Sequence, residues 1–400
     1  MKDIIKVRSR FKDEAEFAKI PVARKETFDG APSELSGRNY AVDSAAAFLH
    51  PSVQYLKVKE VVQLSRDTKS FILEPDFSHG TASLAYFRPG QYISITLQIG
   101  QSVVTRPYTL CSSPKQTKNE EYCITVKKNP RGFASAYIFD NWVKGTEVTA
   151  SAPNGTFYYQ PLRDARHIVG IADSDGIYPF VSMARAISEG TLNLDLTVLY
   201  GARKKAEAVY AQEIADIAAQ TPRVKIALIL SDERIPNCER GFITKGIIEK
   251  YAPRAKYSVF VCGSTPFYNL IAPQIAELNL ERRFVRFGLT GQIKNPTAIV
   301  GFPPEAIGKT FLCKVIVSGE VVATIPCQAE ETVLVALERE GIAANSSCRS
   351  GECGYCRAKL TKGNVFIPKG LDYRREADSA YGIIHPCCSY PMSDLTIVLN

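Results

Sequence analysis

The chain has 400 residues, of which 45% are hydrophobic and 22% are charged. This composition is typical of a soluble globular protein of roughly two to four domains. The net charge of +8 is spread without a block of Lys or Arg, so we do not expect a nucleic-acid partner, whereas an acidic protein partner stays open. No apolar run is long enough for a signal peptide or a membrane span, which predicts a cytoplasmic protein. The eleven cysteines are an odd number, which favours reduced thiols and metal ligation over a disulfide framework.

Residues 1–51 carry no chemistry that can be assigned. The stretch "FKDEAEFAKI" predicts a charged helix, and "AVDSAAAFLHP" predicts a short second helix that ends before Pro51. Two interpretations of this extension stay open: an arm packed on the surface of the next domain, or an arm that docks a partner.

Residues 52–160 contain two predicted strands, "FRPGQYISITL" after a turn and a second strand that ends in "TRPYTLCSSP". The second stretch carries the pattern R-x-Y-[ST]-x-x-S, formed by Arg106, Tyr108, Thr109 and Ser112. This pattern resembles the flavin-binding signature of the ferredoxin–NADP reductase superfamily. A guanidinium can clamp a phosphate, an aromatic ring can pack on the flavin, and a hydroxyl can hydrogen-bond its edge. The resemblance implies a six-stranded antiparallel β-barrel that binds flavin.

A second pattern, G-x-x-S, follows the stretch "ITVKKN" and is formed by Gly132 and Ser135. It lies at a predicted helix start, where backbone N–H groups and the positive end of the helix dipole suit a pyrophosphate. The resemblance also assigns Val126 and Lys127 to cofactor binding, and it implies FAD. FMN stays the alternative, because its single phosphate would need fewer contacts.

Residues 161–295 alternate apolar runs with helical stretches. The runs are "HIVGIA", "LDLTVLYGA", "VKIALIL" and "YSVFVCG", and the helical stretches include "PFVSMARAISE" and "KAEAVYAQEIADIAAQ". This alternation predicts βαβ units in a parallel sheet, and hence an α/β doubly wound nucleotide-binding domain. In the superfamily this domain binds the nicotinamide coenzyme.

The turn after the first of these strands departs from the superfamily pattern A-G-G-x-G-I-T-P. It reads "ADSDGIYP", residues 172–179, and keeps only Gly176, Ile177 and Pro179 after its first alanine. The substituted positions are Asp173, Ser174, Asp175 and Tyr178. Side chains stand where glycines let the backbone approach the coenzyme, and two carboxylates repel a pyrophosphate. This turn puts nicotinamide binding in question.

Other coenzyme-binding features are kept. By resemblance Cys262 faces the nicotinamide, and Gly263 follows it in the stretch "VCGSTPFY". A small buried residue at a strand end is the alternative interpretation of Cys262. Asp232 and Glu233 lie where members that read a 2′-phosphate carry a serine and basic residues, so we expect NADH rather than NADPH.

Residues 311–400 follow a linker, 296–310, and contain "SSCRSGECGYC", in which Cys348, Cys353 and Cys356 have the spacing C-x4-C-x2-C. With a distant fourth cysteine, either Cys387 or Cys388, this is the plant-type [2Fe–2S] spacing. A zinc site is the alternative, although zinc ligands usually come as two separate C-x2-4-C pairs. The segment resembles a plant-type ferredoxin domain of α+β (β-grasp) fold. The family's C-x-x-Y-P segment then assigns Cys387 as the fourth ligand.

The ferredoxin-like segment also predicts a hairpin in "KVIVSGEVVATIPC" and an amphipathic helix in "ETVLVALEREGI", which ends at Gly341. The domain order resembles the reductase component of multicomponent oxygenases. That resemblance implies electron transfer from NADH through FAD to the cluster and then to a partner protein, a terminal oxygenase or reductase, with Tyr108 and Cys262 at the site of hydride transfer. Two alternatives stay open: a subunit that shuttles electrons between proteins without binding nicotinamide, and a redox sensor. The oligomeric state is not predicted.

Overall fold

The computed structural model describes residues 45–46, 49–100, 102–129, 132–288, 293, 295–299, 301–368 and 376–399. The described residues from Leu49 onward belong to one compact unit. The two helices predicted within residues 1–51 lie almost wholly outside the described residues, so that prediction is not tested.

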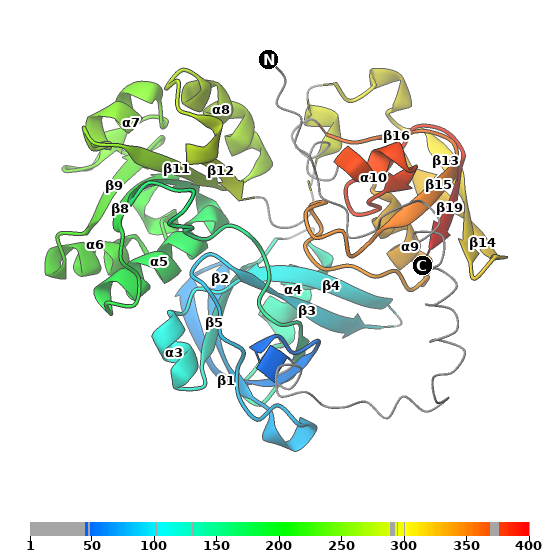
Figure 1. Cartoon of the computed structure of the whole chain (residues 1–400), viewed down its shortest axis with the longest axis horizontal. Helices are drawn as coiled ribbons and strands as arrows, with labels where there is room; N and C mark the ends of the chain where they lie inside the picture. Colours follow the sequence, from blue (N-terminus) through cyan, green and yellow to red (C-terminus); the bar gives the residue numbers. More distant parts are fainter. Residues whose placement is uncertain are drawn as a thin grey trace, which may run out of the picture. The chain divides into compact units, whose positions relative to one another are not determined.

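The first sheet, blue to cyan in Figure 1, has six antiparallel strands in the order β4-β3-β6-β1-β2-β5. Its strands are β1 (Gln54–Ser65), β2 (Thr68–Pro75), β3 (Tyr92–Ile99), β4 (Ser102–Thr109), β5 (Tyr122–Lys127) and β6 (Glu147–Ala150). An isolated bridge between Leu110 and Ile124 brings the two end strands together, which closes the sheet. Its core includes Phe71 and Trp142, whose rings pack edge to face. The predicted antiparallel barrel is confirmed.

Two helices and one 3-10 turn accompany this barrel. They are α3 (Pro114–Lys118), α4 (Phe133–Asn141) and the turn at Phe77–His79. Ser113 caps α3 through a reciprocal capping box with Gln116, and Pro114 occupies the first turn, where a missing N–H costs nothing.

The second sheet, green in Figure 1, has six parallel strands in the order β10-β9-β8-β7-β11-β12. The strands are β7 (His167–Asp173), β8 (Asp195–Ala202), β9 (Val224–Leu230), β10 (Glu239–Arg240), β11 (Tyr257–Cys262) and β12 (Val285–Gly288). The long central strands are buried along almost their whole length, as expected for a parallel sheet covered on both faces. The strand order reverses beside β7, and ligands bind at such a point in doubly wound folds.

The helices of this domain are α5 (Tyr178–Ser188), α6 (Ala211–Gln220), α7 (Lys245–Tyr251) and α8 (Thr265–Ala276). The four predicted strands are confirmed, and the sequence did not show the short strands β10 and β12. The helix expected from Lys205 was wrong in its first half. Lys205–Glu207 form a 3-10 turn, and Tyr210 has φ +65°, which no α-helix accommodates, so α6 begins at Ala211.

The C-terminal domain has a five-stranded sheet in the order β14-β13-β19-β15-β17 and a small pair, β16-β18. The strands are β13 (Thr310–Val317), β14 (Glu320–Gln328), β15 (Ala358–Lys362), β16 (Val365–Phe366), β17 (Ile383–Ile384), β18 (Tyr390–Pro391) and β19 (Leu395–Leu399), with helices α9 (Val333–Arg339) and α10 (Glu376–Ala380). The predicted hairpin and amphipathic helix are confirmed. Thr332 caps α9, and Gly341 adopts φ +71° just beyond its end.

Candidate functional site

Arg106 and Tyr108 lie on β4 and are half-buried. Nη1 of Arg106 donates hydrogen bonds to the Thr105 carbonyl (2.9 Å) and to Oε1 of Glu338 (3.4 Å). Burial and the nearby charge of Arg349 lower the pKa of Arg106, while burial raises the pKa of Tyr108 and keeps its phenol neutral. One carboxylate does not neutralise two guanidinium groups, so a phosphate beside Arg106 would complete the charge balance.

The two hydroxyls of the same pattern differ in their surroundings. Thr109 ends β4 opposite Tyr92 of β3. Ser112 is fully buried, its hydroxyl accepts from the amide of Cys123 (3.1 Å), and its carbonyl accepts from the Ser182 hydroxyl of α5 (2.6 Å). Ser112 therefore ties β5 and α5 together, and its assignment to flavin binding stays a prediction.

At the N-terminus of α4, the absence of a side chain on Gly132 lets a ligand come close to the backbone. Gly132 is its N-cap, and a Cβ there would lie 2.5 Å from Oγ of Ser135 and 2.8 Å from Cβ of Asn129. Among the described residues no side chain caps this helix end, so its N–H groups suit the pyrophosphate of FAD. Val126 lies in the barrel core and can offer only backbone groups. These residues fit FAD.

The cysteines of the C-terminal domain converge although Cys387 is distant in sequence. The amide of Gly351 donates to Sγ of Cys387 (3.3 Å), and the amides of Ser350 and Cys353 donate to Sγ of Cys348 (3.4 Å each). Hydrogen bonds with the thiols of Cys353 and Cys387 hold the pKa of Cys348 well below its ordinary value. A thiolate set that accepts backbone N–H groups fits an iron–sulfur cluster.

The sulfur positions do not form the tight set that a single zinc ion requires. Around a single zinc ion the sulfurs would lie about 3.8 Å apart, because Zn–S bonds are about 2.3 Å long. Among the described residues, no three cysteine sulfurs lie within 4.8 Å of one another. Cys388 donates instead to the carbonyl of His385 (3.5 Å), which supports Cys387 as the fourth ligand.

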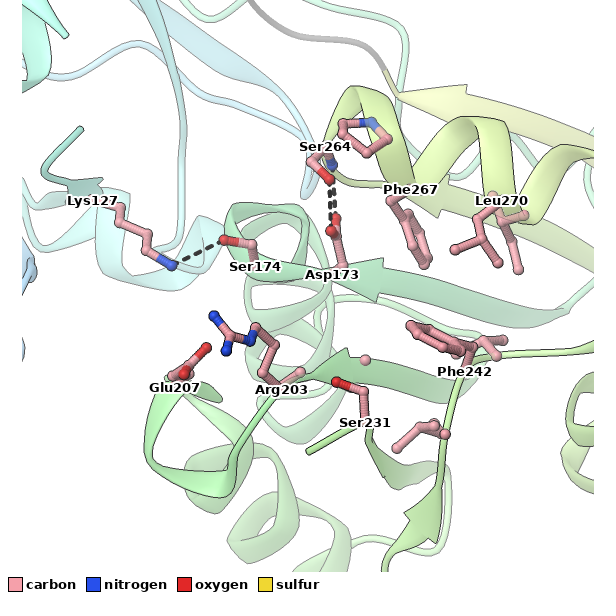
Figure 2. Close-up of a pocket in the computed structure, with 17 residues that line it drawn as sticks. Lys127, Asp173, Ser174, Arg203, Glu207, Ser231, Phe242, Ser264, Phe267 and Leu270 are labelled. Atoms are coloured by element: carbon pink, nitrogen blue, oxygen red, sulfur yellow. Dashed lines mark hydrogen bonds between the residues drawn. The ribbon is translucent and has the colours of Figure 1, made fainter. Parts of the chain in front are cut away.

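The side chain of Asp173 fastens the unusual turn after β7 to the start of α8, as Figure 2 shows. Both carboxylate oxygens of Asp173 accept hydrogen bonds from Ser264, one from its amide and one from its hydroxyl, each 2.7 Å long. Ser174 adopts φ +45°, where glycine is normally preferred. Gly176 is required by packing, since a Cβ there would lie 1.9 Å from the carbonyl oxygen of Cys262.

A cavity of about 530 Å³ opens beside this turn, at the carboxyl ends of the parallel strands. Lys127 reaches it from β5 of the barrel and donates to the hydroxyl of Ser174 (3.2 Å; Figure 2). Arg203 also lines the cavity and pairs with the carboxylate of Asp232 (2.9 Å). The apolar wall is formed by Phe242, Ile243, Phe267, Leu270 and Ile271. The carboxylates of Asp173 and Glu207 also line the cavity. The two cations suit the phosphates of a nicotinamide dinucleotide, and the apolar wall suits its rings.

Cys262 ends β11 below this turn. It is buried, its thiol donates to the carbonyl of Gly288 (3.4 Å), and burial followed by the charges of Asp173 and Asp175 raises its pKa to about 12. The thiol is therefore neutral at physiological pH. A Cβ on Gly263 would lie 2.1 Å from the Asp173 carboxylate, so this glycine admits the Asp173 side chain. The roles of Cys262 and Gly263 toward nicotinamide stay predictions.

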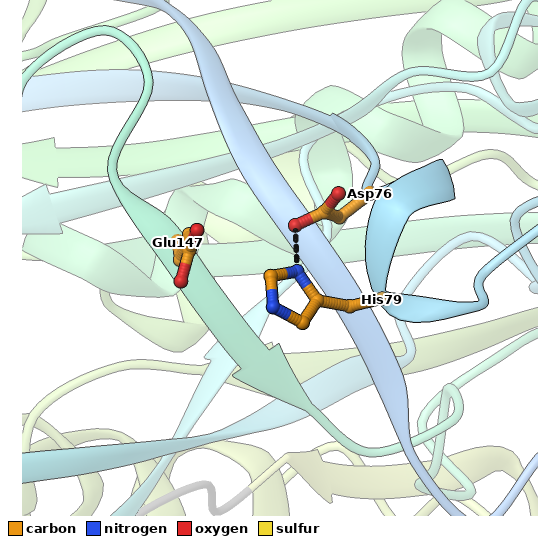
Figure 3. Close-up of side chains that lie close together, drawn as sticks. All are labelled: Asp76, His79 and Glu147. Atoms are coloured by element: carbon orange, nitrogen blue, oxygen red, sulfur yellow. Dashed lines mark hydrogen bonds and ion pairs between the residues drawn. The ribbon is translucent and has the colours of Figure 1, made fainter.

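A cluster outside these sites groups Asp76, His79 and Glu147 (Figure 3). Lys57 donates to Oδ1 of Asp76 (2.9 Å), and Nδ1 of His79 lies 2.6 Å from Oδ2. A lysine and a 3-10 turn thus already satisfy this carboxylate, so the cluster has a structural explanation.

Sequence reasoning placed Lys127 among the cofactor-binding residues, and the structure places its side chain beside Ser174, at the turn of residues 172–179. Sequence reasoning gave no role to Arg349, which is almost fully buried inside the cysteine loop and binds Glu338 of α9. An arginine between two cluster cysteines was the available signal.

Three family models match the chain. An oxidoreductase FAD-binding domain matches residues 55–159, an oxidoreductase NAD-binding domain matches 171–272, and a 2Fe-2S iron-sulfur cluster binding domain matches 313–392. The predicted class, a flavin- and [2Fe–2S]-dependent oxidoreductase with an NAD-binding domain, is confirmed. No helix in the described part of the chain is long and apolar enough to cross a membrane.

Relatives extend over most of the chain. A glycine betaine monooxygenase reductase subunit from Pseudomonas aeruginosa is 26% identical over 351 residues, covering 84% of this chain and 93% of that protein. A 3-ketosteroid-9-alpha-monooxygenase ferredoxin reductase component from Mycolicibacterium smegmatis is 25% identical, covering 85% and 94%. The structure of phthalate dioxygenase reductase matches with a TM-score of 0.63 at 21% identity, covering 87% and 98%. The predicted three-domain architecture is confirmed.

Proposed function

Because the chain belongs to the ferredoxin–NADP reductase superfamily, we propose that it is the NADH-dependent reductase component of a multicomponent oxygenase. It delivers electrons through FAD and a [2Fe–2S] cluster to a separate oxygenase protein. The relatives whose names place them in monooxygenase systems support this function. When bound, FAD takes the two electrons of a hydride, and the cluster releases them one at a time.

The observation that carries the proposal is the contact between the cysteine loop and the barrel strands beside Arg106 and Tyr108. Ser347, next to the first cluster cysteine, shares a 2.9 Å hydrogen bond with Ser94 of β3. Arg349 reaches the carbonyl of Thr105 on β4 (3.4 Å). The flavin strand and the cluster loop therefore lie side by side, as electron transfer between them requires.

Each group of residues has one proposed task. Arg106, Tyr108 and Gly132 hold FAD, and Lys127 and Arg203 hold the coenzyme. The buried Cys262 packs beneath the turn as a neutral thiol. The cluster ligands are Cys348, Cys353, Cys356 and Cys387.

Asp173 favours a second candidate function. Its carboxylate occupies the N-terminal end of α8 beside the cavity, where it would repel a coenzyme phosphate. A subunit that exchanges electrons between proteins without nicotinamide would tolerate this carboxylate.

Anaerobic addition of NADH to the purified holoprotein distinguishes the two functions. We expect micromolar NADH to bleach the flavin and cluster absorbance rapidly. Reduction by dithionite without reduction by NADH would support the second candidate. Protein that carries neither flavin nor iron and sulfide would contradict both.

A further inference from the structure

One carboxylate, that of Glu338, lies between arginines from two domains. Arg349 donates to it through both terminal nitrogens, at 2.6 and 3.0 Å. Arg106, on the flavin strand β4, donates to the same Oε1 at 3.4 Å. The side chains of Arg349 and Glu338 are 1% and 9% exposed, and that of Arg106 is 24% exposed.

Because the Glu338 carboxylate is buried, its ion pairs depend on how closely the C-terminal domain and the barrel approach each other. A buried carboxylate is costly unless cations and hydrogen bonds compensate for its lost hydration. Glu338 and Arg349 belong to the C-terminal domain, whereas Arg106 lies two residues before Tyr108 in the barrel. Arg349 also donates to the backbone of β4 at Thr105. If the C-terminal domain moved away, Arg106 and the carbonyl of Thr105 would lose these partners.

Other contacts between the cysteine loop and the barrel depend on the same alignment. Ser347 pairs with Ser94 (2.9 Å), and Glu352 accepts a hydrogen bond from the hydroxyl of Thr156. Tyr92 of β3 is 2% exposed. The cysteine loop thus contacts β3 through Ser347 and β4 through Arg349. The ion pair between Arg349 and Glu338 joins the same loop to α9.

We propose that Glu338, with Arg106 and Arg349, is an interdomain ionic lock that positions the cluster loop against the flavin strand. This inference rests on the proposed function, since the lock would set the rate of electron transfer from flavin to cluster. Glu338 is a positioning residue, because it acts through two arginines. The intact buried pair contributes little net stability, but removing one partner is costly, so cluster content has to be measured together with docking.

The test uses the holoprotein with Glu338→Gln, which keeps the shape of the side chain and removes its charge. Glu340→Gln is the matched control, because Glu340 pairs with Arg339 of its own domain. Hydrogen–deuterium exchange of residues 102–109 and 344–356 reports docking directly. Stopped-flow absorbance reports reduction of flavin and cluster separately, and iron and sulfide assays report cluster content.

In Glu338→Gln we expect faster exchange in both segments and unchanged flavin reduction by NADH. Cluster reduction should be roughly tenfold slower, because a misplacement of about 1 Å between reacting groups has effects of that size or larger. Glu340→Gln should match the parent protein. Unchanged exchange together with unchanged cluster reduction in Glu338→Gln would overturn the lock.

If the Glu338→Gln protein loses its cluster, the Glu338→Asp variant is used to test the lock instead. Aspartate keeps the charge next to Arg349 but is one methylene shorter, so it forfeits the contact with Arg106. Faster exchange at 102–109 supports the lock, and parental exchange overturns it. Exchange does not depend on NADH. Reduction by dithionite without reduction by NADH would therefore refute the proposed function. The exchange measurements would still test the lock in that case.

Discussion

The cysteine loop and the turn of residues 172–179 are both cofactor-facing loops, and they have kept their family patterns to different degrees. In the cysteine loop, Gly351 and Gly354 adopt φ +74° and +71°, and backbone amides point at sulfur. In the turn, Ser174 takes a left-handed conformation and Asp173 turns its carboxylate onto α8. A plant-type [2Fe–2S] cluster is held by four cysteine thiolates, so residue type is required there. A coenzyme is bound through the shape and charge of its site, so other side chains can compensate when the glycines of the turn are replaced.

The largest effect should come from the loop in which residue type is required. Cys387→Ser removes the proposed fourth cluster ligand, so we expect loss of the cluster and of all cluster-dependent electron transfer, while NADH still reduces the flavin. Iron and sulfide assays with visible spectroscopy measure this loss. The control Cys388→Ser should keep its cluster, because the Cys388 thiol donates to a backbone carbonyl. The reverse result would make Cys388 the fourth ligand.

In the turn of residues 172–179, the test is whether the Lys127 cation supplies the coenzyme affinity that the family's glycines would give. Lys127→Met should raise KM for NADH roughly tenfold to a hundredfold, since a hydrogen bond to a charged group contributes about 1.5–3 kcal/mol. Steady-state reduction of ferricyanide measures KM without involving the cluster. Lys128→Met is the control, because Lys128 pairs with Asp140 outside the cavity. Equal KM values in the two variants would remove Lys127 from the coenzyme site.

The same contrast explains what the sequence could predict. Strand alternation and cysteine spacing are local patterns, and they predicted the three domains and a set of cysteines that the structure brings together. Asp173 finds Ser264 across 91 residues, and Lys127 finds Ser174 across 47. Such pairs depend on which strand ends meet at one edge of a sheet, and no local pattern encodes that. The sequence therefore showed that the turn is unusual and could not show how its carboxylate is satisfied.

Asp173→Asn should have a smaller effect, with a characteristic pH dependence. Burial, together with the charge of Asp175, raises the pKa of Asp173 above its ordinary value. An acid with a raised pKa favours folding fully below its unfolded pKa of about 4, and this contribution is lost as pH rises through the folded value. The free energy of unfolding of the parent protein should therefore fall relative to Asp173→Asn above about pH 4.

Urea denaturation at several pH values measures this difference. In the parent protein KM for NADH should also rise with pH, because the ionised carboxylate repels the pyrophosphate, and this rise should be weaker in Asp173→Asn. A pH-independent difference in stability would show that Asp173 titrates normally in the folded protein.

The smallest effect concerns the choice between NADH and NADPH. Arg203 is paired with Asp232, and Asp232 also accepts from the hydroxyl of Ser231 (2.7 Å). Asp232→Ser would remove a carboxylate that repels a 2′-phosphate and would free Arg203 to bind it. We expect the ratio of kcat/KM for NADPH to that for NADH to rise roughly fivefold, the scale of an exposed ion pair. Glu233→Gln is the control, since Glu233 accepts from the amide of Lys205. If both variants kept the parental ratio, Asp232 would not contact the ribose, and the coenzyme would have to lie elsewhere in the cavity.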